Sequence, residues 1–272
     1  MYKRVIVIVG MPRSGTSWLS QILDSCPSVR FRLSPLFSYA FKNAVDENST
    51  KEEYEAVFHG AYQATDEFME QTLEREQGHY PRFADKVQNP EFLVIKMTRF
   101  HNLLVTMLDY FKSLKMVAIV RHPCGAINSW LATPKEFPAD ADPMSEWRSG
   151  TCRKTGPEEF WGFEDWKTVT RLHMQLNQRY PEQFTLVQYE DLVDAPVNVT
   201  KTLFTFLGLP YTSQTKVFLR ESQSRHDENT HSTFKLPSVK DRWKTELHPQ
   251  IQAEIVADID NSDNSDLRHF LK

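Results

Sequence analysis

Two short segments of this 272-residue chain combine glycine, hydroxyl and arginine residues in patterns that suit phosphate binding. The first is Gly10–Ser17, which reads GMPRSGTS and directly follows the apolar run Val5–Val9. The second is Arg121–Ser129, which also follows an apolar run and has an arginine at its start and a serine at its end. Converging backbone N–H groups and a helix N-terminus attract an anion, and a guanidinium adds positive charge. These segments therefore predict two anion sites.

The first segment has the spacing of a Walker A loop, G-x-x-x-x-G-K-S/T, but Thr16 stands in the place of the lysine. The basic side chain lies inside the loop instead, as Arg13. The Walker lysine serves the β- and γ-phosphates of a nucleoside triphosphate, and an Asp that ends a strand helps to hold Mg²⁺. No strand-like run ends in Asp here, since Met116–Val120 is followed by Arg121. This pattern disfavours an NTPase or a kinase.

Apolar runs predict the elements that position these segments. Short, continuous runs are typical of strands buried on both faces of a parallel sheet, and they occur at Val5–Val9, Phe92–Met97, Met116–Val120 and Phe184–Gln188. Helical patterns follow them at Gly15–Asp24, Phe100–Phe111, Pro123–Trp130 and Pro196–Leu207. The alternation predicts an α/β fold with a P-loop-type central parallel sheet flanked by helices, in a single domain over residues 1–272.

Three stretches lie outside this alternation. Asn48–Gln77 starts with a capping box and predicts one long helix. Thr133–Pro157 holds several prolines and mixed charges without periodicity, which predicts a long loop, and such loops are usually functional or disordered. Ser222–Ser238 is polar and histidine-rich and is predicted to be irregular.

Composition excludes several classes of protein. Lys and Arg number 32 against 36 Asp and Glu, for a net charge of −4, which argues against a general nucleic-acid partner. The three cysteines, Cys26, Cys124 and Cys152, form no C-x-x-C pair, so neither a disulfide framework nor a cysteine zinc site is indicated. No apolar run approaches the ~20 residues of a membrane span, and the N-terminus lacks the pattern of a signal peptide. We expect a cytoplasmic protein, and nothing in the sequence indicates its oligomeric state.

The two anion segments resemble motifs of one enzyme family. Met11–Leu19 resembles the 5′-phosphosulfate loop of sulfotransferases that use 3′-phosphoadenosine 5′-phosphosulfate (PAPS). Arg121–Ser129 resembles that family's 3′-phosphate motif, and Tyr189–Leu192 (YEDL) resembles the family's Y-E-D-L segment. Arg242, followed by Trp243, resembles the R-W element of carbohydrate-type and protein-tyrosine-type members. The similarity runs from about Lys3 to Leu247.

This resemblance implies transfer of a sulfuryl group from PAPS to an acceptor hydroxyl, with adenosine 3′,5′-bisphosphate (PAP) as the product and no metal. The implied cofactor-binding residues are Arg13, Ser14, Gly15, Thr16, Ser17, Trp18, Arg121, Ser129, Tyr189 and Arg242. Arg13 is also implied to stabilise the leaving phosphate, and Lys96 to contact the sulfuryl oxygens. The alternatives are a nucleotide-dependent kinase with a degenerate P-loop and a non-catalytic nucleotide-binding relative.

The family's usual general bases are missing. Cytosolic relatives carry a histidine two residues after the lysine, where this chain has Thr98, and Arg30–Pro35 lacks the glutamate of Golgi-type relatives. His101 is the nearest group that titrates near neutral pH, so we expect it to be the base, although a capping or solvent-facing role fits as well. His122 and Asp85 have weaker positional support.

The acceptor site is expected in the variable segments. Residues 133–165 mix aromatic and cationic side chains, which suits a carbohydrate or an anionic glycan, although a solvated loop has the same composition. A small-molecule acceptor is equally compatible with the sequence. Residues 222–240 are expected to form a lid over the cofactor.

Overall fold

β1 is the central strand of a five-stranded, fully parallel sheet with the order β2-β3-β1-β4-β5. The computed structural model describes residues 2–271, so the two ends of the expected domain, Met1 and Lys272, lie outside the described residues. The strands are β1 (Arg4–Val9), β2 (Val29–Leu33), β3 (Phe92–Met97), β4 (Lys115–Val120) and β5 (Phe184–Gln188). The predicted P-loop-type α/β fold, with a central parallel sheet flanked by helices, is confirmed, and the four predicted strands are all present.

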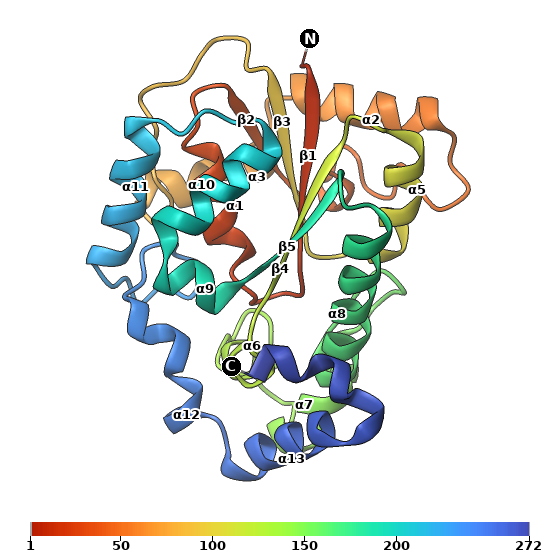
Figure 1. Ribbon diagram of the computed structural model, residues 1–272, viewed down its shortest axis with the longest axis vertical. Coiled ribbons are helices and arrows are strands. Elements are labelled where there is room, and N and C mark those ends of the chain that lie inside the picture. The colour runs from red at the N-terminus through yellow and green to blue at the C-terminus, as the bar shows by residue number, and fades with distance from the viewer. Residues whose placement is uncertain (1, 272) are drawn as a thin grey trace.

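Helices cover both faces of this sheet (Figure 1). One face packs against α1 (Thr16–Asp24), α9 (Tyr189–Asp194), α10 (Pro196–Leu207) and α11 (Ser213–Ser224). The other packs against α2 (Lys51–Gln63), α5 (Leu104–Tyr110) and α8 (Gly162–Arg179). Along β1, Ile6 and Ile8 enter the first core while Val5, Val7 and Val9 enter the second, because successive side chains of a strand point to opposite faces.

A third core lies at the carboxyl end of the sheet, where the lower helices of Figure 1 meet. It is rich in tryptophan and contains Trp130, Trp147, Trp161 and Trp166, all buried. Its helices are α6 (Pro123–Leu131), α7 (Pro143–Ser149), α8 and α13 (Pro249–Asp260). The remaining helical segments are α3 (Glu67–Glu70), α4 (Thr72–Glu76), α12 (Trp243–Glu246) and the 3-10 turns Pro35–Phe37, His101–Leu103, Thr151–Arg153, Pro237–Asp241 and Ser262–Leu271. This core supports the loops that leave the strands.

The sequence analysis missed the edge strand β2, which reads VRFRL. Its two arginines interrupt the apolar pattern, yet both donate hydrogen bonds to backbone carbonyl oxygens. Arg32 donates to the carbonyl oxygens of Ala61 and Ala64 at 2.7 Å each, and Arg30 donates to that of Tyr62 at 2.9 Å. The strand therefore holds the C-terminal end of α2.

The single long helix expected over Asn48–Gln77 is wrong. Its predicted start is present, since Thr50 and Glu53 form the capping box of α2. The helix ends at Gln63, where Arg32 engages the last carbonyls, and Asp66 then caps the short α3 by accepting from Met69 N–H at 2.7 Å. Gln71 adopts a left-handed conformation, φ 57°, which separates α3 from α4.

The two irregular segments are more structured than expected. The stretch 133–165 contains α7, which starts at Pro143 with Asp142 as its N-cap and buries Trp147, and its last residues already belong to α8. The segment 222–240 begins inside α11. Within residues 2–271, no helix is both long enough and apolar enough to cross a membrane.

Candidate functional site

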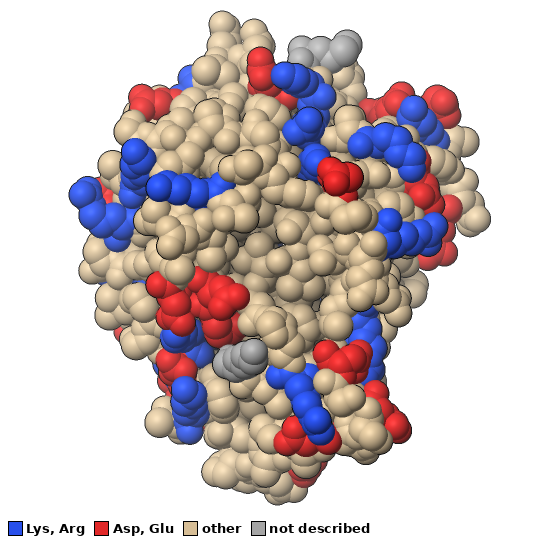
Figure 2. All heavy atoms as spheres, in the orientation of Figure 1, with Lys and Arg blue, Asp and Glu red and all other residues tan. Residues whose placement is uncertain are grey.

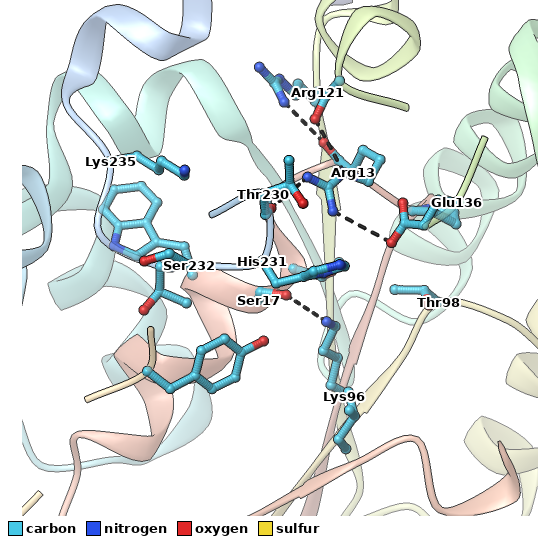
Figure 3. A pocket seen from close by; sticks show the side chains of 18 of the residues that line it. Arg13, Ser17, Lys96, Thr98, Arg121, Glu136, Thr230, His231, Ser232 and Lys235 are labelled. Carbon is cyan, nitrogen blue, oxygen red and sulfur yellow. Dashed lines mark hydrogen bonds and ion pairs between the residues drawn. The ribbon is translucent and has the colours of Figure 1, made fainter. Parts of the chain in front are cut away.

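A cavity of about 450 Å³ lies where the loops after β1 and β4 meet the carboxyl end of β3. The sequence-predicted residues that line it are Arg13, Gly15, Thr16, Ser17, Trp18, Lys96, Arg121, Ser129 and Tyr189. Figure 3 shows Arg13, Lys96 and Arg121 approaching this cavity from different elements. The structure thus brings the two predicted anion segments together in one pocket.

The loop after β1 depends on two left-handed residues. Arg13 has φ 68° and Gly15 has φ 94°, and the loop then enters α1 at Thr16. Gly15 lies against the ring of Tyr189, because a Cβ added there would be 2.4 Å from Tyr189 Cδ2. Ser14 is buried beneath the loop, with its hydroxyl unpartnered among the described residues. The loop therefore presents its backbone at the N-terminus of α1, where an anion is favoured.

Arg13 joins the loop to two distant segments. Its Nε donates to Ser129 Oγ at 3.2 Å, and its Nη2 donates to the carbonyl oxygen of Thr230 at 2.8 Å. Its Nη1 lies 3.5 Å from Glu136 Oε1. These contacts connect the loop after β1 to α6 and to the 222–240 segment.

Arg121 carries a buried charge without a carboxylate partner. The residue is only 7% exposed, and across residues 2–271 no carboxylate lies within ion-pair distance of it. Its Nη1 donates to the carbonyl oxygen of Arg13 at 3.1 Å, its guanidinium lies 4.6 Å from the centre of the Tyr189 ring, and its Nε has no partner among the described residues. A buried guanidinium without a carboxylate partner is suited to an anionic ligand.

Lys96 brings a further positive charge to the cavity from the end of β3. Its Nζ donates to Ser17 Oγ at 2.7 Å. Burial lowers the pKa of Lys96 from 10.5 to about 8; the negative charge of Glu136 opposes this effect, and the positive charge of Arg13 adds to it. A bound anion would therefore stabilise the charged form of Lys96.

Trp18 and Tyr189, two further sequence-predicted residues, form part of the cavity wall. Trp18 donates from Nε1 to Ser222 Oγ at 3.0 Å and meets the ring of Tyr189 edge-on. This contact ties α1 to α11. Arg242, in contrast, is exposed, forms a 2.6 Å ion pair with Glu246 and is not among the described residues that line the cavity. We therefore do not assign Arg242 to cofactor binding in this conformation.

The expected assignment of His101 as general base needs correction. His101 is 1% exposed and packs against Phe160 and His173, outside the described lining of the cavity. Neither ring nitrogen has a partner among the described residues, and burial lowers its pKa to about 3. The ring belongs to the core because the chain turns at Phe100, φ 60°, and directs the next residue inward. The other histidine considered, His122, caps α6 by accepting from Cys124 N–H at 3.2 Å.

Sequence reasoning missed several residues that line the cavity. Glu74 comes from the stretch expected to be one long helix, and the others come from stretches outside the predicted strands and helices: Tyr80, Glu136, Thr230, His231 and Lys235. The only signal was the histidine-rich, polar character of Ser222–Ser238. Thr98, at the position where relatives place a histidine, also lines the cavity.

The positive charge of the site is local. On the face drawn in Figure 2, Lys and Arg are interspersed with Asp and Glu, and acidic side chains gather over α9. The cavity is lined by the sequence-predicted cations Arg13, Lys96 and Arg121, together with Arg99, Lys135, Arg153 and Lys235. Such an arrangement favours a small anion over an extended polyanion.

The fold and this pair of anion segments define a sulfotransferase-like site, and comparison with known families agrees. The model of the Sulfotransferase family matches residues 5–213, and the chain therefore belongs to this family. It is 24% identical over 146 residues to carbohydrate sulfotransferase 3 of Tetronarce californica. This match covers 51% of the chain and 32% of that protein, so the chain matches only about a third of that curated relative.

Solved sulfotransferase structures share the fold. The mouse sulfotransferase SULT7A1 complexed with PAP superimposes with a TM-score of 0.57 at 16% identity, covering 99% of this chain and 89% of that one. The sulfotransferase domain of the olefin synthase of Synechococcus PCC 7002 gives a TM-score of 0.52 at 19% identity, covering 96% of both chains. At these identities the likeness establishes the fold alone.

We predict that Gly15→Ala weakens the fold and the anion site together. Its positive φ strains any L side chain, at a cost of about 1–3 kcal/mol, and the new Cβ would displace Tyr189, beneath Arg121. Gly78→Ala is the matched control, since its φ is 77° but nothing lies within 4 Å of the added Cβ. In urea unfolding, Gly15→Ala should lose clearly more stability than Gly78→Ala. Equal losses would contradict the close approach to Tyr189.

We also predict that His101 makes the protein sensitive to acid. The unfolded chain protonates this histidine near pH 6.5, whereas the folded one does not until about pH 3, so stability falls as the pH drops below about 6.5. His101→Phe should remove about 2 kcal/mol of the loss in unfolding free energy between about pH 7 and 5. His59→Phe, at an exposed position of α2, is the control. An unchanged acid dependence in His101→Phe would refute this prediction.

Proposed function

We propose that this sulfotransferase transfers a sulfuryl group from PAPS to an acceptor hydroxyl and releases PAP. The observation that carries the proposal is the buried, carboxylate-free guanidinium of Arg121 beside the phosphate loop. PAPS differs from ATP in its 3′-phosphate, and a second cationic position beside the first anion loop fits that extra group. The guanidinium of Arg121 and the hydroxyl of Ser129, which both line the cavity, supply donors for it.

Arg13 and Lys96 would act at the end of the cofactor that carries the sulfuryl group. PAPS supplies the activated sulfuryl group, and the chain supplies position and charge. Arg13 and the loop N–H groups at the start of α1 would neutralise the 5′-phosphate as it leaves. Lys96, fixed by Ser17, would hold the sulfuryl oxygens. In a loose transition state such groups contribute mainly orientation and charge stabilisation.

The acceptor would enter past the aromatic part of the cavity. Phe37 lies 4.0 Å beneath the guanidinium of Arg99, and Trp161 lies 5.6 Å from that of Arg153. Trp161 is buried with an indole N–H that has no partner among the described residues. Aromatic faces beside cationic groups suit a carbohydrate or another small hydroxyl-bearing molecule. We also propose the 133–165 segment as the acceptor side, the 222–240 segment as the cofactor lid and a cytoplasmic location.

A nucleotide-dependent kinase is the alternative, and the site does not favour it. Thr16 occupies the place of the Walker lysine, and none of the five described strands ends in the Asp that helps to hold Mg²⁺ in P-loop NTPases. A non-catalytic relative would keep the anion site and bind PAP without turnover. These alternatives differ in measurable ways.

Calorimetry with PAP should show binding in the micromolar range, and Arg121→Met should weaken it by at least about tenfold, because a charged hydrogen-bond donor is lost. Arg179→Met is the matched control, since that arginine is 63% exposed at the end of α8. Absence of PAP binding to the wild-type protein would refute the proposed function. Preferential binding of ATP with Mg²⁺ would support the kinase instead.

The affinity for PAP should also fall above about pH 8. Lys96 loses its proton near that pH in the free protein, and an anion binds best to the charged form, so binding takes up a proton. We expect up to about a tenfold loss between about pH 7 and 9. Lys96→Met should bind PAP more weakly but without this dependence. A wild-type affinity that stays constant over the range would contradict a charge interaction between Lys96 and the bound nucleotide.

A further inference from the structure

His231 is the histidine that the fold delivers to the cavity. It lies in the 222–240 segment, and in Figure 3 it projects between Arg13 above and Lys96 below. Neither of its ring nitrogens makes a hydrogen bond within residues 2–271, and neither is shielded from solvent. The imidazole is thus half-buried in the pocket with both nitrogens accessible.

A network around His79 fixes the backbone on both sides of His231. Asn229 Oδ1 accepts from His231 N–H at 2.9 Å, which leaves the Asn229 amide to donate to His79 Nε2, also at 2.9 Å. His79 Nδ1 therefore carries the proton and donates to Asp227 Oδ2 at 2.8 Å. The carbonyl oxygen of His79 in turn accepts from Thr233 N–H at 3.1 Å. These bonds hold the turn that presents His231.

The same turn is hydrogen-bonded to Arg13. Thr230, which precedes His231, accepts a hydrogen bond from Arg13 Nη2 through its carbonyl oxygen at 2.8 Å. Ser232, which follows His231, donates to the carbonyl oxygen of His79 at 3.2 Å. The position of His231 is therefore coupled to the arginine that would neutralise the leaving phosphate.

The other titratable groups near the cavity are less suitable as bases. Glu136 has one carboxylate oxygen next to Arg13 and the other buried without access to solvent. His101 is in the core, and Thr98 replaces the histidine of relatives with a group that does not titrate near neutral pH. Among the histidines in the described chain, His231 is the one that lines the cavity.

The surroundings of His231 keep it neutral. Burial lowers its pKa below 6.5, and the positive charges of Arg13 and Lys135 act in the same direction, while Glu136 and Glu74 oppose them. A neutral imidazole at pH 7 has a lone pair with which to accept a proton.

We propose that His231 is the general base of the transfer reaction, an inference that rests on the proposed function. A ring nitrogen of His231 takes the proton of the acceptor hydroxyl while the acceptor oxygen bonds to sulfur. The bond from sulfur to the bridging oxygen breaks, and its electron pair stays on the 5′-phosphate of PAP, next to Arg13. The imidazolium then returns its proton to water. The base thus comes from the lid, so that transfer requires the lid to lie over the cofactor.

The test compares wild-type protein with His231→Ala, with PAPS and a panel of sugars and phenols as acceptors, or water alone as the reference acceptor. We expect His231→Ala to lower kcat by at least about 100-fold, as loss of a general base does. PAP affinity should stay near the wild-type value, and added imidazole should restore part of the rate. The wild-type rate should fall as the pH drops through the pKa of His231, and the variant should lack this acid limb.

His59→Ala is the matched control, because this histidine is exposed on α2, outside the described lining of the cavity, and should leave the rate unchanged. A near-normal kcat in His231→Ala, or a loss without imidazole rescue and with the acid limb retained, would overturn the proposal. Failure of wild-type protein to bind PAP would instead refute the proposed function, and the assignment of the base with it. The two failures are therefore distinguishable.

Chemical modification supplies a measurement that does not depend on turnover. Diethyl pyrocarbonate acylates neutral, accessible imidazoles, and peptide mapping locates the modified residue. We expect His231 to react at neutral pH in the free protein and to be protected by PAP. A His231 that stays unmodified while His226 reacts would overturn the proposed exposure of its ring to the cavity.

Discussion

The burial of positive charge without a matching carboxylate is the constraint on which this structure depends. Arg121 is 7% exposed and Lys96 is 9% exposed, and each satisfies its donors mainly with backbone or hydroxyl oxygens. Removing such charges from water costs several kcal/mol, which the fold has to offset elsewhere. The apolar cores on the two faces of β1 contribute that stabilisation. A bound anion would offset part of this cost, and that part would appear as affinity for the ligand.

The order of the strands determines which charges meet. β1 lies between β3 and β4 with all strands parallel, so the end of β3, the loop after β1 and the start of α6 adjoin at one edge of the sheet. Lys96, Arg13 and Arg121 occupy these three places. The left-handed conformations of Arg13 and Gly15 then turn the loop so that its backbone faces the cavity. Topology brings the charges together, and local backbone geometry directs them.

Much of this could be predicted from the sequence because it rests on local patterns. Continuous apolar runs located four strands, and the glycine spacing located the loop between β1 and α1. β2 was not predicted, because its arginines donate to carbonyl oxygens of a helix that is distant in the sequence, and no local pattern indicates such contacts. Glu136 and His231 were not predicted as site residues for a related reason. They reach the cavity through contacts between segments that are far apart in the chain, such as the contact of Arg13 with Thr230. His101 was misassigned because proximity to Lys96 in the sequence does not reveal that its ring turns into the core.

The central claim is that two separate cationic positions in one cavity bind the two phosphates of PAP. A crystal structure of the full chain with PAP tests it most directly. We predict one phosphate on Arg13 and the loop at the start of α1, and the other on Arg121 and Ser129. A nucleotide bound outside this cavity, or with neither phosphate in contact with Arg121, would contradict the account.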